Sequence, residues 1–183
     1  MNVQTITLVS FGFYEPDFLE NIAKAVRPEL GFAVNIRDGH IDLSEFYDPA
    51  RRQYNGNSLL KMVDTLSFPE SFKTLGIFNV DLYIPILTYI FGQAFLNGRS
   101  GIASLYRFSN ERYGISGNNH YLLERFRKEV IHELGHTFGL IHCPTIICVM
   151  RSSTYVEDVD QKKQHLCHNC SAQLESNLES YLI

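Results

Sequence analysis

The stretch of sequence that decides the fold is HELGHTFGLIH, residues 132–142. His132 and His136 are four residues apart, so on a helix their side chains project from the same face, one turn apart. Two imidazoles at this spacing can converge on one Zn²⁺ at roughly 2.0–2.1 Å. Gly139 can adopt a left-handed conformation and end the helix, after which the chain can turn and supply His142 as a third ligand. The stretch therefore predicts a three-histidine zinc site.

A carboxylate lies beside the first of these histidines. Glu133 is offset by one residue from His132, so it lies near the metal but is aimed beside it. There it can take a proton from metal-bound water instead of ligating the metal. Three neutral histidines leave an open fourth position, where bound water is acidified toward a pKa of ~7. This pattern is typical of a catalytic zinc site with Glu133 as general base.

All four cysteines of the chain fall in one short region that follows the histidines. In a reducing compartment, clustered cysteines are more often metal ligands than disulfides. Four thiolates form a closed tetrahedral site with no place for substrate, which is typical of a structural zinc. Two disulfides, free thiols, or a site in which His165 or His168 replaces one cysteine are the alternatives. The residues of the cluster are Cys143, Cys148, Cys167 and Cys170.

The composition is that of one ordinary globular domain. The chain has 183 residues, of which 45% are hydrophobic and 20% charged. A formal net charge of −4 gives no overall basic field for nucleic acid or an anionic membrane. Residues 1–13 lack the features of a signal peptide, and the uncharged stretch 82–98 is interrupted by Pro85, Gly92 and Gln93. We therefore expect a soluble cytoplasmic protein without a membrane or nucleic-acid partner.

The spacing of apolar residues predicts an alternation of strands and helices. The expected strands cover residues 3–9, 32–36, 77–84, 89–96 and 102–108, and the expected helices run from about 15 to 31, 57 to 68, 121 to 138 and 171 to 182. Asn57 or Ser58 is the expected cap of the second helix, and residues 38–57 are expected to be irregular. The alternation favours a mostly parallel sheet, and the Asn97-Gly98 turn implies one antiparallel neighbour.

The helix that carries His132 is expected to begin at an Asn118 or Asn119 cap and to be amphipathic. Its apolar stripe consists of Leu122, Phe126, Val130 and Leu134. Its charged residues are expected to form a solvated face: Glu124, Arg125, Arg127, Lys128 and Glu129. His40 and His120 lie outside any ligand spacing and are expected at the surface or as caps.

The histidine stretch continues into a second pattern. Cys143 follows His142 directly, then come Cys148 and Met150, and the pattern ends with CHNC at residues 167–170. This C-x4-C-x-M…C-x-x-C continuation is similar to that of the archaemetzincin family of metzincin-clan zinc peptidases. The sixteen residues between Met150 and Cys167 are the one departure in length from the family pattern.

The resemblance implies a metzincin-like zincin fold of the α/β (α+β) class. It implies a mostly parallel, twisted sheet with one antiparallel edge strand and an active-site helix. It further implies a small, loop-rich C-terminal subdomain with a structural zinc. The whole chain, residues 1–183, would be a single catalytic domain. Residues 1–139 would form the upper subdomain and residues 140–183 the zinc-clipped one.

The resemblance also implies a role for each matching residue. His132, His136 and His142 would bind the catalytic zinc, and Glu133 would be the general base and then the proton shuttle. Met150 would form a hydrophobic floor beneath the metal ligands. The second, structural zinc would be held by Cys143, Cys148, Cys167 and Cys170. The chain would thus carry two zinc ions.

Two further features bear on the substrate. In metzincins an antiparallel edge strand above the cleft binds the substrate backbone as an added strand. By this resemblance, Gly92, Gln93 and Ala94, which precede the Asn97-Gly98 turn, would form that strand. An ordinary buried or edge strand is an equally good interpretation of these residues. Tyr155 can donate a hydrogen bond to a developing oxyanion, or it is simply a packed or surface tyrosine. We expect a monomeric zinc peptidase that hydrolyses extended peptides. A non-catalytic zinc-containing peptide-binding module is the alternative.

Overall fold

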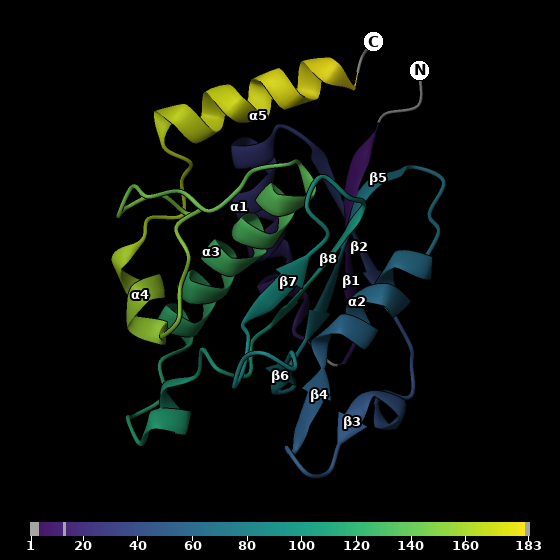
Figure 1. The fold of residues 1–183 in the computed structure, drawn as a ribbon, viewed down its shortest axis with the longest axis vertical. Coiled ribbons are helices and arrows are strands. Elements are labelled where there is room, and N and C mark those ends of the chain that lie inside the picture. The colour runs from purple at the N-terminus through teal and green to yellow at the C-terminus, as the bar shows by residue number, and fades with distance from the viewer. Residues whose placement is uncertain (1–3, 13, 182–183) are drawn as a thin grey trace.

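The computed structural model describes residues 4–12 and 14–181. Its centre is a five-stranded sheet in the order β2-β1-β5-β8-β7 (Figure 1). Four strands are parallel, and only β7 at the edge runs antiparallel to its neighbour β8. This confirms the mostly parallel sheet with one antiparallel edge strand. The strands are β1 Thr5–Ser10, β2 Ala33–Asp38, β5 Ser71–Phe78, β7 Gly92–Ala94 and β8 Ser100–Ser104.

Helices cover both faces of the sheet. The helices α1 (Pro16–Leu30) and α3 (Asn119–Thr137) lie on one face, and α2 (Gly56–Thr65) lies on the other (Figure 1). Alternate residues of β1 therefore belong to different cores: Leu8 packs with the α1 and α3 side, and Val9 packs with the α2 side. Every residue of β1 is buried, as is typical of a parallel strand covered on both faces.

The strand expected at residues 77–84 is wrong in its position. The strand β5 covers Ser71–Phe78 instead, and Leu82–Tyr83 forms β6 in a separate small sheet. The apolar pattern missed the first half of this strand because residues 71–74 include polar side chains. Among them is Lys73, whose charge would place it at the surface, whereas the structure buries it. Its ammonium donates to the carbonyl oxygens of Gly98 and Thr137, at 2.8 Å each.

The segment expected to be irregular contains short elements. Residues 38–57 include the 3-10 helix η1 (Leu43–Phe46) and the strands β3 (Tyr47–Asp48) and β4 (Gln53–Asn55). The strand β4 pairs with both β3 and β6. A second 3-10 helix, η2, covers Asn110–Tyr113. These elements are too short to produce a periodic pattern in the sequence.

The helix ends agree with the expectations in two of three cases. Gly31 ends α1 in the left-handed conformation with φ of 76°. The Asn118 side chain accepts hydrogen bonds from the backbone N–H groups of His120 and Tyr121 and so caps α3. The cap of α2 is Asn55 rather than Asn57 or Ser58, because the Asn55 side chain accepts the backbone N–H of Ser58 at 3.1 Å.

The C-terminal part contains more helix than expected. The helix α4 (Val156–Gln161) was not predicted, and α5 (His168–Ser180) begins three residues before the predicted start. In Figure 1, α5 crosses above the end of α3. There Asn177 donates its side-chain amide to the carbonyl oxygen of Phe138 at 2.8 Å. Among the described residues, no helix has both the length and the apolar character that a membrane span requires.

Candidate metal centres

The three predicted histidines come together at the C-terminal end of α3. One ring nitrogen of each lies within 4.8 Å of the others, and the Nε2 atoms of His132 and His136 are 3.1 Å apart. Two ligands of a tetrahedral Zn²⁺ at 2.0–2.1 Å are about 3.4 Å apart. His132 is buried, His136 is half-buried and His142 is exposed. The group therefore has the size of a zinc site that is open to solvent on one side.

Backbone carbonyls orient two of the rings. The Nδ1 atom of His132 lies 2.8 Å from the carbonyl oxygen of Val149, and that of His136 lies 2.7 Å from the carbonyl oxygen of Leu140. Because a carbonyl only accepts, Nδ1 carries the hydrogen in both rings and Nε2 keeps a free lone pair for a metal. Burial lowers the pKa of all three imidazoles, which favours the neutral, ligating form.

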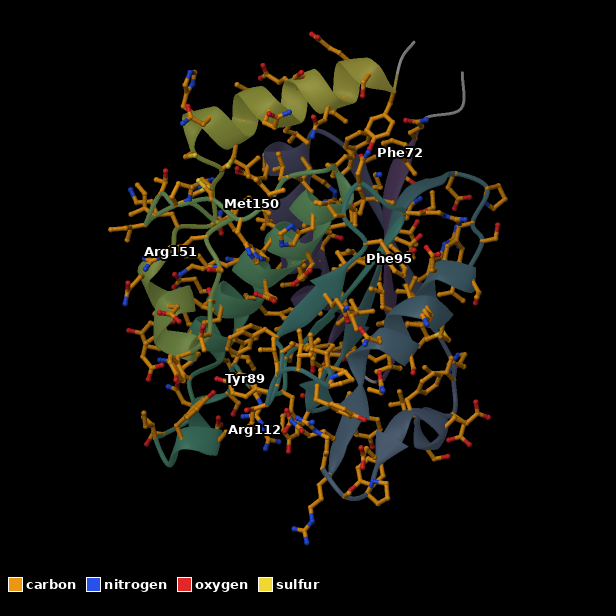
Figure 2. All side chains as sticks on the ribbon, viewed as in Figure 1. Phe72, Tyr89, Phe95, Arg112, Met150 and Arg151 are labelled. Carbon is orange, nitrogen blue, oxygen red and sulfur yellow. The ribbon has the colours of Figure 1, made fainter. Side chains whose placement is uncertain are left out.

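Two glycines of the stretch let the site close. An added Cβ at Gly135 would collide with the sulfur of Met150, so the glycine makes room for Met150 against α3. Met150 is fully buried and lies on the segment between α3 and α4 (Figure 2). Gly139 has a φ of +86° and ends the helix, as the sequence predicted. The chain then turns back so that His142 faces the other two imidazoles.

Glu133 is buried beside this group. Its side chain lies against the edge strand: a Cβ at Gly92 would be 2.7 Å from Glu133 Cγ and 2.8 Å from Oε1. Its Oε2 atom is buried and accepts no hydrogen bond from the residues that the structure describes. Burial and the neighbouring Glu129 raise the pKa of Glu133 well above its ordinary value. A buried carboxyl with a free oxygen next to three imidazoles that could hold a metal is suited to proton transfer.

The expected solvated face of α3 is wrong for three of its five residues. Arg125 is 8%, Lys128 2% and Glu129 4% exposed. The helix α4, which the sequence did not reveal, covers this face. Arg125 pairs with Asp160 at 2.7 Å, and Lys128 donates to the carbonyl oxygen of Val159 at 3.2 Å. The four-residue spacing of Glu129 and Glu133 was the signal in the sequence that could have placed Glu129 next to the base.

The four cysteines form the second group. Their sulfur atoms lie within 4.8 Å of one another, with Cys143 and Cys167 3.7 Å apart and Cys148 and Cys170 3.8 Å apart. Ligands of a tetrahedral zinc at 2.3 Å are about 3.8 Å apart, so the sulfurs have the spacing of a four-thiolate site. None of the four thiols forms a disulfide in the structure. A hydrogen bond from the backbone of Cys170 lowers the pKa of Cys167 to about 6.

The remaining histidines lie apart from both groups. His40 and His120 are exposed, as expected. His165 is exposed and lies 2.9 Å from a carboxylate oxygen of Glu29, and His168 is exposed at the start of α5. Neither belongs to the group that the four sulfurs form, so no histidine is needed to complete it.

Two cavities flank the histidines and Glu133. One of about 320 Å³ extends toward Tyr155 and the buried Lys162, with residues 87–92 along one side. The other, of about 400 Å³, is lined by β7 and by apolar side chains that include Leu96 and Ile141. The strand β7 pairs only with β8 in the five-stranded sheet and stands at its edge. The cleft thus runs along an edge strand and past the three histidines.

The chain is similar to known peptidases over nearly its whole length. Residues 21–176 match the family model of Peptidase family M54. The chain is 36% identical to the archaemetzincin of Thermococcus kodakarensis, over 98% of this chain and 100% of that protein. It is 38% identical to the archaemetzincin of Pyrococcus horikoshii, over 88% of this chain and 87% of that protein.

Solved structures agree with these matches. The crystal structure of archaemetzincin from Methanopyrus kandleri superposes with a TM-score of 0.85 at 32% identity and covers 97% of both chains. A zinc-dependent peptidase from Methanocorpusculum labreanum gives a TM-score of 0.83 at 27% identity, over 92% of this chain and 99% of that one. The chain therefore belongs to Peptidase family M54, the family of the archaemetzincins, and is a zinc metallopeptidase.

Proposed function

We propose that His132, His136 and His142 hold the catalytic zinc and that Glu133 is the general base in the hydrolysis of a peptide bond. The observation that carries this proposal is the placement of a buried carboxyl with a free oxygen beside three convergent imidazoles. The Nε2 spacing of 3.1 Å between His132 and His136 fits tetrahedral zinc, and the rings are held in the ligating tautomer.

Each residue has a defined part in the reaction. A zinc ion bound here supplies Lewis acidity, which acidifies water and polarises the scissile carbonyl. Glu133 accepts a proton from the attacking water at its free Oε2 and passes it to the nitrogen of the leaving amine. Gly92 and the burial of the site keep the carboxyl in one place and exclude competing water from its far side.

We further propose that Cys143, Cys148, Cys167 and Cys170 hold a structural zinc. Four thiolates leave no open position, so this metal would have no contact with substrate. Cys143 is next to His142, and its backbone N–H donates to the carbonyl oxygen of Met150 at 2.9 Å. A metal at the cysteines would therefore fasten the third histidine and the Met150 segment to the start of α5. Four free thiols also fit the cytoplasmic location expected from the sequence.

An extended peptide is the substrate form that the cleft fits best. The edge strand β7 carries backbone groups that can pair with an added strand, and the two cavities lie on either side of the histidines. Tyr155 is 62% exposed and lines the smaller cavity, where its hydroxyl can reach a bound substrate. Nothing in this arrangement requires a second copy of the chain.

The test replaces the base alone. Glu133→Gln keeps the size of the side chain and removes the proton acceptor, so zinc content should stay unchanged while cleavage of a peptide library falls by at least about a hundredfold. Metal analysis and mass spectrometry of the digested library, with and without chelator, provide the readout. Hydrolysis at the wild-type rate by the variant would refute the role of Glu133. Peptide binding without cleavage by the unchanged protein would favour the binding-module alternative.

A further inference from the structure

Lys73 is a buried cation that lines neither of the two cavities beside the histidines. It belongs to β5 and is 3% exposed. A lysine is almost never buried to this extent without partners, because removal of its charge from water is costly. Among the residues that the structure describes, no carboxylate forms an ion pair with Lys73. Its partners must therefore be polar groups of another kind.

These partners are backbone carbonyls of two segments that lie far apart in the sequence. The ammonium of Lys73 donates to the carbonyl oxygen of Gly98, in the turn between β7 and β8 (residues 95–99), and to that of Thr137, the last residue of α3, at 2.8 Å each. The last carbonyls of a helix have no partner within the helix, and a cation is favoured at this end by the helix dipole. Lys73 thus joins the turn that follows β7 to the helix that carries His132 and His136.

Aromatic rings surround the rest of the ammonium. The nitrogen lies 4.7 Å from the ring centroid of Phe72, 5.1 Å from that of Phe138 and 5.0 Å from that of Tyr181. At these distances the face of a ring attracts a cation. Phe138 directly follows α3 and Tyr181 directly follows α5, and Phe72 lies beneath the C-terminal end of α5 (Figure 2). The position of the cation is therefore fixed from several elements at once.

A second contact joins the same turn to α3. The backbone N–H of Asn97 donates to the carbonyl oxygen of His136 at 2.8 Å, and the Asn97 side chain is hydrogen-bonded to the hydroxyl of Tyr181. Asn97 has a φ of +53°, in the left-handed region that asparagine tolerates better than most residues. Two adjacent carbonyls of α3, those of residues 136 and 137, thus bind the turn, one directly and the other through Lys73.

We propose that Lys73 is a positioning residue that holds β7 within hydrogen-bonding reach of a peptide bound at the histidines. This inference rests on the proposed binding of an extended peptide along β7. The strand has three residues and pairs only with β8 in the five-stranded sheet, so its own ladder constrains it little. Without Lys73 the turn loses one of its two links to α3. The imidazoles of His132 and His136 keep their own carbonyl partners, Val149 and Leu140.

Three variants test this role. Lys73→Met removes the ammonium and keeps a side chain of nearly the same length, whereas Lys73→Arg retains the charge and donors for both carbonyls. Lys128→Met is the matched control. Lys128 is also a buried lysine, at 2% exposed, but its ammonium donates to the carbonyl oxygen of Val159 before α4 ends and not to the turn after β7.

The main readout is the affinity for an extended peptide, chosen from the library because the unchanged, zinc-loaded protein binds it. We expect its Kd to rise at least about fivefold in Lys73→Met, the loss that corresponds to about one main-chain hydrogen bond to the peptide. Lys73→Arg should restore most of the affinity, and Lys128→Met should lower the unfolding midpoint without a change in Kd. Fluorescence anisotropy in the Glu133→Gln background measures binding without turnover.

Kinetics and metal analysis separate positioning from a merely structural role. In the background with Glu133 intact, KM of Lys73→Met should rise by the same factor as Kd while kcat changes less than about threefold. Zinc content should stay the same, because the partners that orient His132 and His136 do not include Lys73. A lower unfolding midpoint by itself would not move the ratio of KM to kcat in protein that is still folded.

Unchanged affinity in folded Lys73→Met would overturn the inference. An equal loss of affinity in Lys128→Met would also overturn it, since it would mean that loss of either buried lysine loosens the site. If Lys73→Met does not fold, Lys73→Gln, which keeps a polar donor, is measured in its place and judged in the same way. The proposed role of Glu133 fails on a different result, cleavage at the wild-type rate by Glu133→Gln.

Discussion

At the scale of single residues, the site depends on small side chains as much as on ligands. Gly135 makes room for the sulfur of Met150, and Gly92 makes room for the Glu133 carboxyl. A side chain at either position would occupy space that the ligands or the base need. The interior is close-packed, so displacement of even one methyl group is transmitted to its neighbours.

Gly92→Ala tests the contact between the edge strand and the base. The added Cβ would lie 2.7 Å from both Glu133 Cγ and the carbonyl oxygen of Ile102, so either the carboxyl or the strand must move. We expect kcat to fall at least about tenfold with zinc content unchanged, because misplacement of a catalytic group by 1 Å can cost about a hundredfold. Steady-state kinetics and metal analysis check this. Wild-type kcat in a folded variant would show that the contact does not hold Glu133.

At the scale of elements, the end of α3 places the third histidine. Gly139 adopts a φ of +86°, and Leu140 donates its N–H to the carbonyl oxygen of Gly135 at 3.0 Å. Asn177 of α5 then binds the carbonyl oxygen of Phe138 at 2.8 Å. The direction in which the chain leaves the helix is thus fixed from two sides, and His142 follows three residues later.

Gly139→Ala should reduce both stability and metal binding. A non-glycine residue in the left-handed conformation costs about 1–2 kcal/mol, and the new Cβ would lie 2.9 Å from the side-chain amide of Asn177. Gly31→Ala is the matched control, since Gly31 ends α1 with a φ of +76° and has no atom within 4 Å of an added Cβ. We expect both variants to unfold at lower denaturant concentration and only Gly139→Ala to bind zinc more weakly and cleave more slowly. Equal zinc affinity in the two variants would mean that Gly139 does not direct His142.

At the scale of the whole molecule, the two groups that could hold a metal differ in their surroundings. The histidines lie at an open cleft with His142 exposed, whereas the cysteines join the turn after α3 to the start of α5. Cys148 is 1% exposed and belongs to the larger core together with Val149 and Met150. A metal at the cysteines would therefore support the part of the fold that carries the third histidine.

Removal of metal should proceed in two stages. We expect fully loaded protein to contain two zinc equivalents, one for each group, and a chelator to remove the histidine-bound zinc first because that site is open. Activity should be lost in the first stage and most of the thermal stability in the second. Metal analysis during dialysis, together with calorimetry, measures both. A single equivalent in fully loaded protein would contradict the two-site proposal, and Cys170→Ser, which removes one thiolate, is the control for the slow stage.

The sequence by itself determined the helix that carries His132 and His136, the turn at Gly139, the parallel sheet with its antiparallel edge and the ligand candidates. These features depend on local spacing: residues four apart share a helix face, and Asn97-Gly98 favours a turn whatever surrounds it. The His and Cys residues also stand close together in the chain, so little folding is needed to bring them into one site.

Only the tertiary structure decided which polar residues are buried. Lys73 of β5 has the charge of a solvent-exposed residue, yet it is buried and donates to the backbone carbonyls of Gly98 and Thr137, so the pattern placed the strand too late in the chain. Arg125, Lys128 and Glu129 are predicted as surface charges, but α4 covers this face of α3 and buries them. The physical reason is that burial of a charge depends on partners supplied by distant segments, which no local pattern contains. The sequence thus named the histidines and cysteines that come together in the structure, and the packing of α4 against α3 buried the charged residues next to them.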